Sequence, residues 1–251
     1  LSKIPREALQ DMRIYHDIFP VYKMVDTCGG EFEALTPYYY STYDDEDEVI
    51  YDGNDKILVV GSGPIRIGQG IEFDYSCVHG AWAINRLGYE SIMINNNPET
   101  VSTDFDTSDR LYFEALHVDD VMNVIKKERP MGVILQFGGQ TSLNITEDLY
   151  NRSINILGTE FQYIDMAEDR EKFSELLNEL DIPTPDGYAV TTEEEAFTAV
   201  AKLKYPVMVR PSYVIGGRAM QVVYSDEELL KYLKEAVSLS EEHPVLVDKY
   251  I

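Results

Sequence analysis

The sequence is poor in the residue types that mark disulfide-rich, metal-rich and membrane proteins. Among 251 residues it has two cysteines, Cys28 and Cys77, which form no CxxC pair and no metal-ligand cluster. This usage favours a reduced, cytoplasmic setting. No apolar run approaches the roughly 20 residues of a membrane helix, and no signal-peptide pattern follows the first residues. We therefore expect no membrane attachment.

Positive charge is also scarce. The chain has 21 Lys and Arg against 45 Asp and Glu, a formal net charge of −24. Such a surface repels phosphate backbones, which argues against a general nucleic-acid binder. Part of the acidity lies in one run, residues 44–48 (DDEDE), which we interpret as part of a solvated linker.

The first 52 residues lack a core pattern of their own. Prolines interrupt their short helical patterns, and tyrosines crowd just before the acidic run. We interpret residues 1–52 as the tail of a preceding domain followed by a linker. The chain would then begin inside a longer protein.

From Asp55 onward, apolar runs alternate with helical patterns. Such runs predict buried strands at residues 57–60, 91–94, 132–135 and 154–157. A helical pattern at 76–87 ends at Gly88, a good helix stop, and another covers 119–127. This alternation predicts an α/β domain over residues 53–165 with a parallel sheet.

A second organisation covers residues 166–251. Asp165 and Glu168 have capping-box spacing and predict a helix start, and Thr192 with Glu195 predicts another. Two strand-like runs, 205–210 and 219–224, flank a glycine-bearing loop. A helix to about residue 237 and a strand at 244–251 complete the expected α+β domain.

The first glycine loop, residues 61–70 (GSGPIRIGQG), follows a predicted strand. A glycine turn between strand and helix can let backbone amides approach an anion. Two features argue against a dinucleotide site: the third glycine comes too late for GxGxxG, and the second strand ends in the run 95–97 (NNN) where an acidic residue should hold the ribose. A dinucleotide-dependent oxidoreductase and a purely structural turn both remain open at this point.

The second glycine loop, residues 212–218 (SYVIGGR), lies between two strand-like runs. This excludes a Walker P-loop, which needs a following helix. A hairpin tip with Gly216 and Gly217 could fold over phosphates, with Arg210 at the end of the preceding strand. Arginine suits this work because its planar fork matches phosphate oxygens. The plainer alternative is a surface hairpin with solvated arginines.

Several ordered motifs resemble carbamoyl-phosphate synthase large chains, in particular their second, C-terminal synthetase unit. They are residues 63–75 (GPIRIGQGIEFDY), 97–104 (NPETVSTD), 107–114 (TSDRLYFE), 138–141 (GGQT), 167–170 (AEDR) and 209–214 (VRPSYV). Residues 25–28 (VDTC) and 31–32 (EF) are similar to the junction with the central helical oligomerisation domain of that family. The resemblance covers nearly the whole chain.

The resemblance implies a fold and a reaction. The fold is a Rossmann-like pre-ATP-grasp domain followed by a truncated ATP-grasp domain. The reaction is the ATP-dependent phosphorylation of carbamate, formed from bicarbonate and glutamine-derived ammonia. It also implies a list of ATP-binding residues: Arg210, Gly216, Gly217, Lys249, Ile251 and Arg170. Lys249 departs from the His or Arg that we associate with its position, which leaves its role open.

The same resemblance places further parts outside this chain. The ligands for Mg²⁺ or Mn²⁺ would lie downstream of Ile251, so we assign no metal ligand and no catalytic residue here and expect the isolated chain to be inactive. The expected partner is a glutaminase small subunit, and the parent would be oligomeric. The alternative is a non-catalytic nucleotide-binding or interaction module with the same fold.

Overall fold

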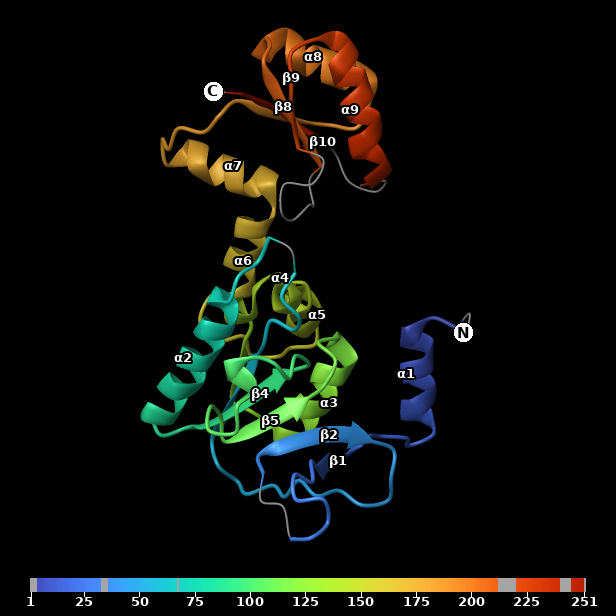
Figure 1. Ribbon diagram of the computed structural model, residues 1–251, viewed down its shortest axis with the longest axis vertical. Helices are drawn as coiled ribbons and strands as arrows, with labels where there is room; N and C mark the ends of the chain where they lie inside the picture. The colour runs from blue at the N-terminus through green and yellow to red at the C-terminus, as the bar shows by residue number, and fades with distance from the viewer. Residues whose placement is uncertain (1–3, 33–35, 67, 212–219, 240–244, 251) are drawn as a thin grey trace. The chain divides into compact units, whose positions relative to one another are not determined.

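The structure is a computed structural model that describes residues 4–32, 36–66, 68–211, 220–239 and 245–250 (Figure 1). The chain divides into two compact units. The first consists of residues 1–65 and 70–166, and the second of residues 66–69 and 167–251. None of the helices in the described ranges combines the length and apolar character of a membrane span.

The first unit is built on a six-stranded sheet with the order β1-β2-β5-β4-β3-β6. Its strands are β1 (Val21–Met24), β2 (Tyr38–Thr42), β3 (Lys56–Val60), β4 (Glu90–Asn95), β5 (Arg110–Phe113) and β6 (Gly132–Ile134). Its helices are α1 (Arg6–Tyr15), α2 (Glu72–Arg86), η1 (Val101–Thr103), α3 (Val118–Glu128), η2 (Gln136–Gly138), α4 (Gly139–Leu143), α5 (Thr146–Asn151) and α6 (Phe161–Glu168), which crosses the division.

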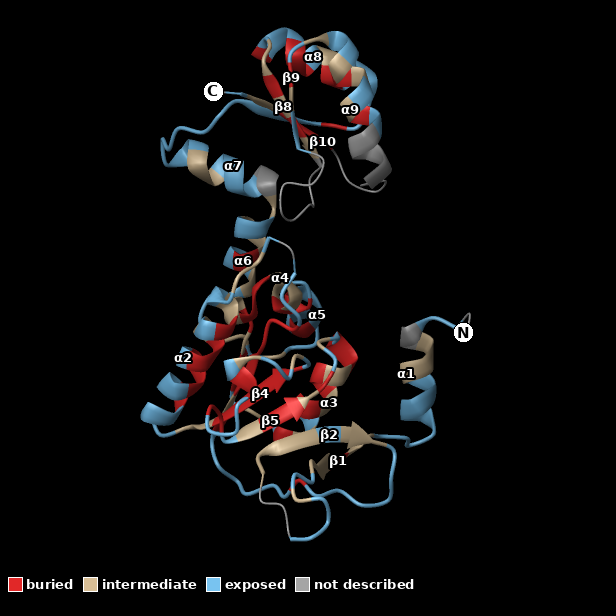
Figure 2. Cartoon of the chain, in the orientation of Figure 1, coloured by how far each residue is buried: buried red, intermediate tan, exposed pale blue. Residues whose placement is uncertain are grey.

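Alternating side chains of the central strands build a core on each face of this sheet. Leu58 and Ile92 pack in one cluster with residues of α3, and Val59 and Met93 pack in another with residues of α2. The β2–β5, β5–β4, β4–β3 and β3–β6 pairs are parallel, and β1 runs antiparallel to β2. The predicted parallel α/β sheet is confirmed. The central strands, which were predicted from continuous apolar runs, are buried on both faces (Figure 2).

Residues 1–52 contribute more than a tail and linker. They supply β1 and β2, which extend the sheet beside β5. Tyr22 is only 1% exposed and meets the Tyr112 ring edge-on at 5.0 Å, while Tyr39 stacks on the same ring. Rings of this size bury enough area to hold an edge strand that has no alternating pattern.

Two further predictions of secondary structure, at residues 154–157 and at Asp165, differ from the structure. The run at 154–157 makes one parallel bridge, between Val133 and Ile156, rather than a strand. The helix start predicted at Asp165 is wrong, because Asp165 lies inside α6. By contrast, the capping box of Thr192 and Glu195 is present in full.

The second unit contains an antiparallel sheet with the order β7-β10-β8-β9. Its elements are α7 (Arg170–Glu179), β7 (Gly187–Val190), α8 (Glu193–Leu203), β8 (Val207–Pro211), β9 (Gln221–Val223), α9 (Asp226–Leu239) and β10 (Val245–Lys249). Val207, Val209, Val245 and Val247 face a cluster that includes residues of α8 and α9. The alternate side chains of β8 and β10 therefore point to the opposite face.

Candidate functional site

The first candidate surface is the carboxyl edge of the parallel sheet. The strand order places β4 on one side of β3 and β6 on the other, which is the switch point where α/β sheets bind ligands. Here the two neighbouring loops close on each other. A Cβ atom on Gly138 would lie 2.4 Å from the Val60 carbonyl oxygen and 2.6 Å from that of Gly61. Only glycine at position 138 lets the loop after β6 approach the end of β3.

Asn95, at the end of β4, ties the first glycine loop in place. Its side-chain oxygen accepts hydrogen bonds from the backbone N–H of Gly63 at 3.0 Å, of Asn96 at 2.9 Å and of Asn97 at 3.4 Å. Its side-chain nitrogen donates to Ser102 Oγ at 3.0 Å. The amide of Gly63, which a dinucleotide site would present to a phosphate, is thus already engaged.

The start of α2 is equally unsuited to a pyrophosphate. Glu72 and Asp74 occupy its first turn, and the buried Asp74 carboxylate accepts the N–H of Ser102 at 3.3 Å. Carboxylates near a helix N-terminus take the place that a bound anion would occupy. Two interpretations of the first glycine loop were left open, and the geometry favours a purely structural turn over a dinucleotide site.

The second candidate surface is the face of the four-stranded sheet opposite α8 and α9. Arg210 lies near the end of β8, and Asp248 lies on the neighbouring strand β10, diagonal to it in the antiparallel register. Arg210 Nε donates to Asp248 Oδ2 at 2.5 Å, with the Arg210 side chain 35% exposed. Asp248 is its one ion-pair partner in the part of the chain that is described. The partial exposure of the side chain is what an approaching anionic ligand would require of the guanidinium N–H groups.

Lys249 lies on the other face of that sheet. It follows Asp248 along β10, stands opposite Val207 and donates its ammonium to the Lys204 carbonyl oxygen at 2.9 Å. Arg210 and Lys249, which were each predicted to bind ATP, therefore lie on opposite faces of the sheet, because successive strand side chains alternate between faces. A contact from Lys249 to ATP stays a prediction. If the Lys249 ammonium made that contact, the side chain would have to leave the Lys204 carbonyl oxygen and adopt another orientation.

The other predicted site residues receive less structural definition. Gly216, Gly217 and Ile251 lie outside the described residues. Arg170 begins α7, and its side chain is not described. Sequence reasoning missed Asp248, although strand alternation along 245–249 could have placed it beside Arg210.

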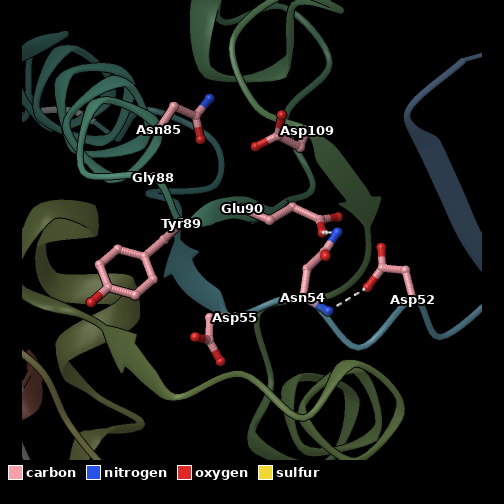
Figure 3. A pocket seen from close by; sticks show the side chains of 8 residues that line it. All are labelled: Asp52, Asn54, Asp55, Asn85, Gly88, Tyr89, Glu90 and Asp109. Atoms are coloured by element: carbon pink, nitrogen blue, oxygen red, sulfur yellow. Dashed lines mark hydrogen bonds between the residues drawn. The ribbon is translucent and has the colours of Figure 1, made fainter.

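No metal site can be assigned to these surfaces. Within the described ranges, no three His, Cys, Asp or Glu side chains are gathered so as to hold a metal ion. Several acidic residues line an open depression at the amino edge of β3 and β4 (Figure 3), formed by Asp52, Asn54, Asp55, Asn85, Gly88, Tyr89, Glu90 and Asp109. Its negative charge is unsuited to a nucleotide.

A parallel pre-ATP-grasp sheet followed by an antiparallel sheet with helices on one face is the arrangement of ATP-grasp proteins. The chain is similar in fold to the biotin carboxylase domain of 2-oxoglutarate carboxylase from Hydrogenobacter thermophilus, with TM-score 0.60 and 20% identity over 79% of this chain and 44% of that one. It is also similar to D-alanine–D-alanine ligase from Bacillus anthracis, with TM-score 0.54 and 19% identity over 80% of this chain and 58% of that one. Likenesses at this identity establish the fold alone.

Sequence relatives define the family. Residues 53–166 match the carbamoyl phosphate synthase preATP-grasp domain, and residues 169–251 match the carbamoyl-phosphate synthase L chain, ATP binding domain. The whole chain is 67% identical to the carbamoyl phosphate synthase large chain of Clostridium acetobutylicum, of which it spans 24%. The chain belongs to the carbamoyl phosphate synthase large chain family.

Proposed function

We propose that this chain opens the second ATP-using unit of a carbamoyl phosphate synthase large chain, where carbamate is phosphorylated to carbamoyl phosphate. The observation that carries the proposal is the partly exposed Arg210, held by Asp248 on the face of the antiparallel sheet opposite α8 and α9. The motif strings 63–75 and 97–104, which resemble the second unit rather than the first, support this choice of step.

The chemistry explains the need for a cation at this place. A carbamate oxygen attacks the γ-phosphorus of ATP, a new P–O bond forms, and the bond to the bridging oxygen breaks to release ADP. Charge spreads over the phosphoryl oxygens, so catalysis rests on positioning and electrostatic stabilisation. Arg210 would donate from its Nη groups to these oxygens, while Asp248 holds Nε and fixes the plane of the guanidinium.

The other predicted ATP-binding residues would complete the proposed site. Gly216 and Gly217 would supply lid amides above the phosphates, Ile251 a backbone contact to the purine, and Arg170 and Lys249 further nucleotide contacts. Mg²⁺ or Mn²⁺, when bound, would neutralise part of the phosphate charge. The resemblance to the family leads us to propose that its ligands lie in other parts of the large chain.

The proposal extends to the whole enzyme. A glutaminase small subunit would deliver ammonia, bicarbonate and ATP would be the other substrates, and the assembly would be oligomeric and cytoplasmic. The chain of 251 residues should not turn over by itself, because it would provide one wall of the nucleotide cleft.

A hybrid enzyme tests the function directly. In the Clostridium acetobutylicum large chain, the 251 matching residues would be replaced by this sequence. The measurement is ATP formation from ADP and carbamoyl phosphate with Mg²⁺ present, the reversal of the proposed step. We expect a rate comparable to that of the unmodified large chain. A folded hybrid with no such activity would contradict the proposal and favour a non-catalytic module with this fold.

A further inference from the structure

The first glycine loop is held by a set of side chains that the proposed reaction does not use. Asn95, Ser102 and Asp74, which we call the Asn95 clamp, come from β4, from η1 and from α2. Asn95 and Ser102 are 0% exposed and Asp74 is 6% exposed. Buried polar groups are costly unless they are satisfied, so such a set is retained only where its hydrogen bonds are made.

The Asn95 clamp joins three separate segments into one body. Asn95 binds the amides of Gly63 and of residues 96–97, and it also binds Ser102 Oγ. Ser102 in turn donates its backbone N–H to Asp74. The side-chain nitrogen of Asn97 donates to the Gly63 carbonyl oxygen at 3.4 Å. Gly63 is therefore held through both its N–H and its C=O group.

Steric contacts also restrict this loop at two of its glycines, Gly61 and Gly63. A Cβ atom on Gly61 would lie 2.7 Å from Asn95 Cγ, and one on Gly63 would lie 3.0 Å from Asn96 Oδ1 and 3.2 Å from Leu116 Cδ1. Gly63 also has φ of +66°, a left-handed conformation that favours glycine. Loops that follow β3, β4 and β5 thus meet at Gly63.

We propose that Asn95 is a positioning residue: it fixes the glycine turn at residue 63 and the loop after β4 as one rigid wall at the carboxyl edge of the parallel sheet, the first candidate surface. This inference rests on the proposed function for its effect on catalysis, but not for the clamp itself. Asn95 is fully buried, so it is not positioned to contact a substrate directly. It acts through the backbone of residue 63, whose displacement would shift the segment leading to α2. Small displacements of a positioning wall slow a reaction more than they weaken nucleotide binding.

Hydrogen exchange on this chain tests the clamp independently of activity. Asn95→Ala removes the acceptor of three amides. The amides of residues 63, 96 and 97 should then exchange roughly tenfold faster, the factor expected for losing one hydrogen bond each. Asn85→Ala, on the exposed end of α2, is the matched control and should change none of them. Unchanged exchange in Asn95→Ala would overturn the clamp.

Kinetics of the hybrid large chain test the positioning role. In Asn95→Ala, kcat for ATP formation from ADP and carbamoyl phosphate should fall about 10- to 100-fold, while KM for ADP stays within about twofold. If exchange rises but kcat is unchanged, the clamp is merely structural and the positioning role is overturned. If the unsubstituted hybrid makes no ATP, the proposed function fails, and hydrogen exchange alone still decides on the clamp.

Exchanging the carboxylate and the amide between positions 74 and 95 tests the positioning role while keeping the net charge of the clamp. Asn95→Asp keeps the oxygen that accepts the amides but places two carboxylates around Ser102, so kcat should fall. Adding Asp74→Asn restores the original net charge of the clamp. The hydrogen bonds can also form again: the new carboxylate at position 95 can accept from Ser102 Oγ, and the new amide oxygen at position 74 can accept from the Ser102 N–H. In this double variant kcat should recover, and a failure to recover would contradict the positioning role.

A third variant serves if Asn95→Ala fails to fold. Ser102→Ala cuts the clamp at its centre, because it removes the Oγ that accepts from the Asn95 side chain. It should speed hydrogen exchange at residue 63, and a failure to do so would also overturn the clamp.

Discussion

Two arginines near strand ends, Arg110 in the first unit and Arg210 in the second, are held in very different ways. The Arg110 side chain is 12% exposed, whereas that of Arg210 is 35% exposed. Arg110 forms ion pairs with three carboxylates, those of Asp52, Glu90 and Glu128. Arg210 has one carboxylate, Asp248, among the residues described. A saturated guanidinium stabilises the fold, and an unsaturated one remains able to bind a ligand.

The charged and polar groups around Arg110 also form ion pairs and hydrogen bonds with one another. Lys56 Nζ lies 2.9 Å from both Glu128 and Asp52, and its side chain is fully buried. The Tyr112 hydroxyl donates to Glu128. Burial and the Glu128 charge raise the pKa of Tyr112 above its usual range, so this hydroxyl keeps its proton. The charged groups around Arg110 are therefore already paired with one another.

The largest effect is expected from Arg110→Ala. It would leave Glu128 buried with a reduced set of partners, and breaking a buried pair costs about 3–5 kcal/mol. Urea unfolding would measure the loss in free energy of unfolding. Arg86→Ala, at the exposed end of α2, is the control and should change it by less than about 0.5 kcal/mol. Equal losses in the two variants would remove the distinction between saturated and solvated arginines.

A smaller effect should appear in the pH dependence of stability. Burial acts to raise the pKa of Asp52, but hydrogen bonds from Lys56 and the Asn54 amide, together with the Arg110 charge, outweigh it and hold the pKa below its usual range. The stability from this group is present above the unfolded-state pKa of about 3.9 and is lost as pH falls toward the lower folded-state value.

The Asp52→Asn variant isolates that contribution. The free energy of unfolding of the unsubstituted chain should fall more steeply than that of Asp52→Asn as the pH is lowered from about 5 to about 2, a range set around the carboxyl pKa of about 3.9. Urea titrations at stepped pH would measure both slopes. Parallel slopes would mean that Asp52 does not contribute to the Arg110 network.

The smallest effect is expected for the stability of Arg210→Ala. Its ion pair is partly solvated, and such pairs contribute about 0–1 kcal/mol. The same urea experiment should therefore place Arg210→Ala close to the unsubstituted chain. A loss as large as that of Arg110→Ala would make Arg210 a structural residue and break the comparison.

Sequence patterns predicted the parts of this fold that depend on local chemistry. Continuous apolar runs identified β3 and β4, and the Thr192 capping box identified the start of α8. The strands β1 and β2 were missed, because Tyr22 and Tyr39 on these strands gain stability from Tyr112, which lies far away in the sequence. Such tertiary packing overrides local pattern.

The candidate site was only partly predictable for a similar reason. The Asn95–Asn97 run counted only as evidence against a dinucleotide site, yet Asn95 proves to be the hub of the clamp. Its partners Gly63 and Ser102 come from other segments. The ion pair of Arg210 with Asp248 likewise depends on strand register, which residue types alone do not give.

The most direct test of the account compares variants of Arg210 in the hybrid large chain. The measurement is kcat for ATP formation from ADP and carbamoyl phosphate in Arg210→Ala, Arg210→Lys and Lys231→Ala, the last removing a cation from α9. Losing one donor to developing charge should lower kcat about 10²- to 10³-fold in Arg210→Ala, with partial recovery in Arg210→Lys and no loss in Lys231→Ala. A folded Arg210→Ala hybrid that retains the full rate would contradict the assignment of Arg210 to the phosphates.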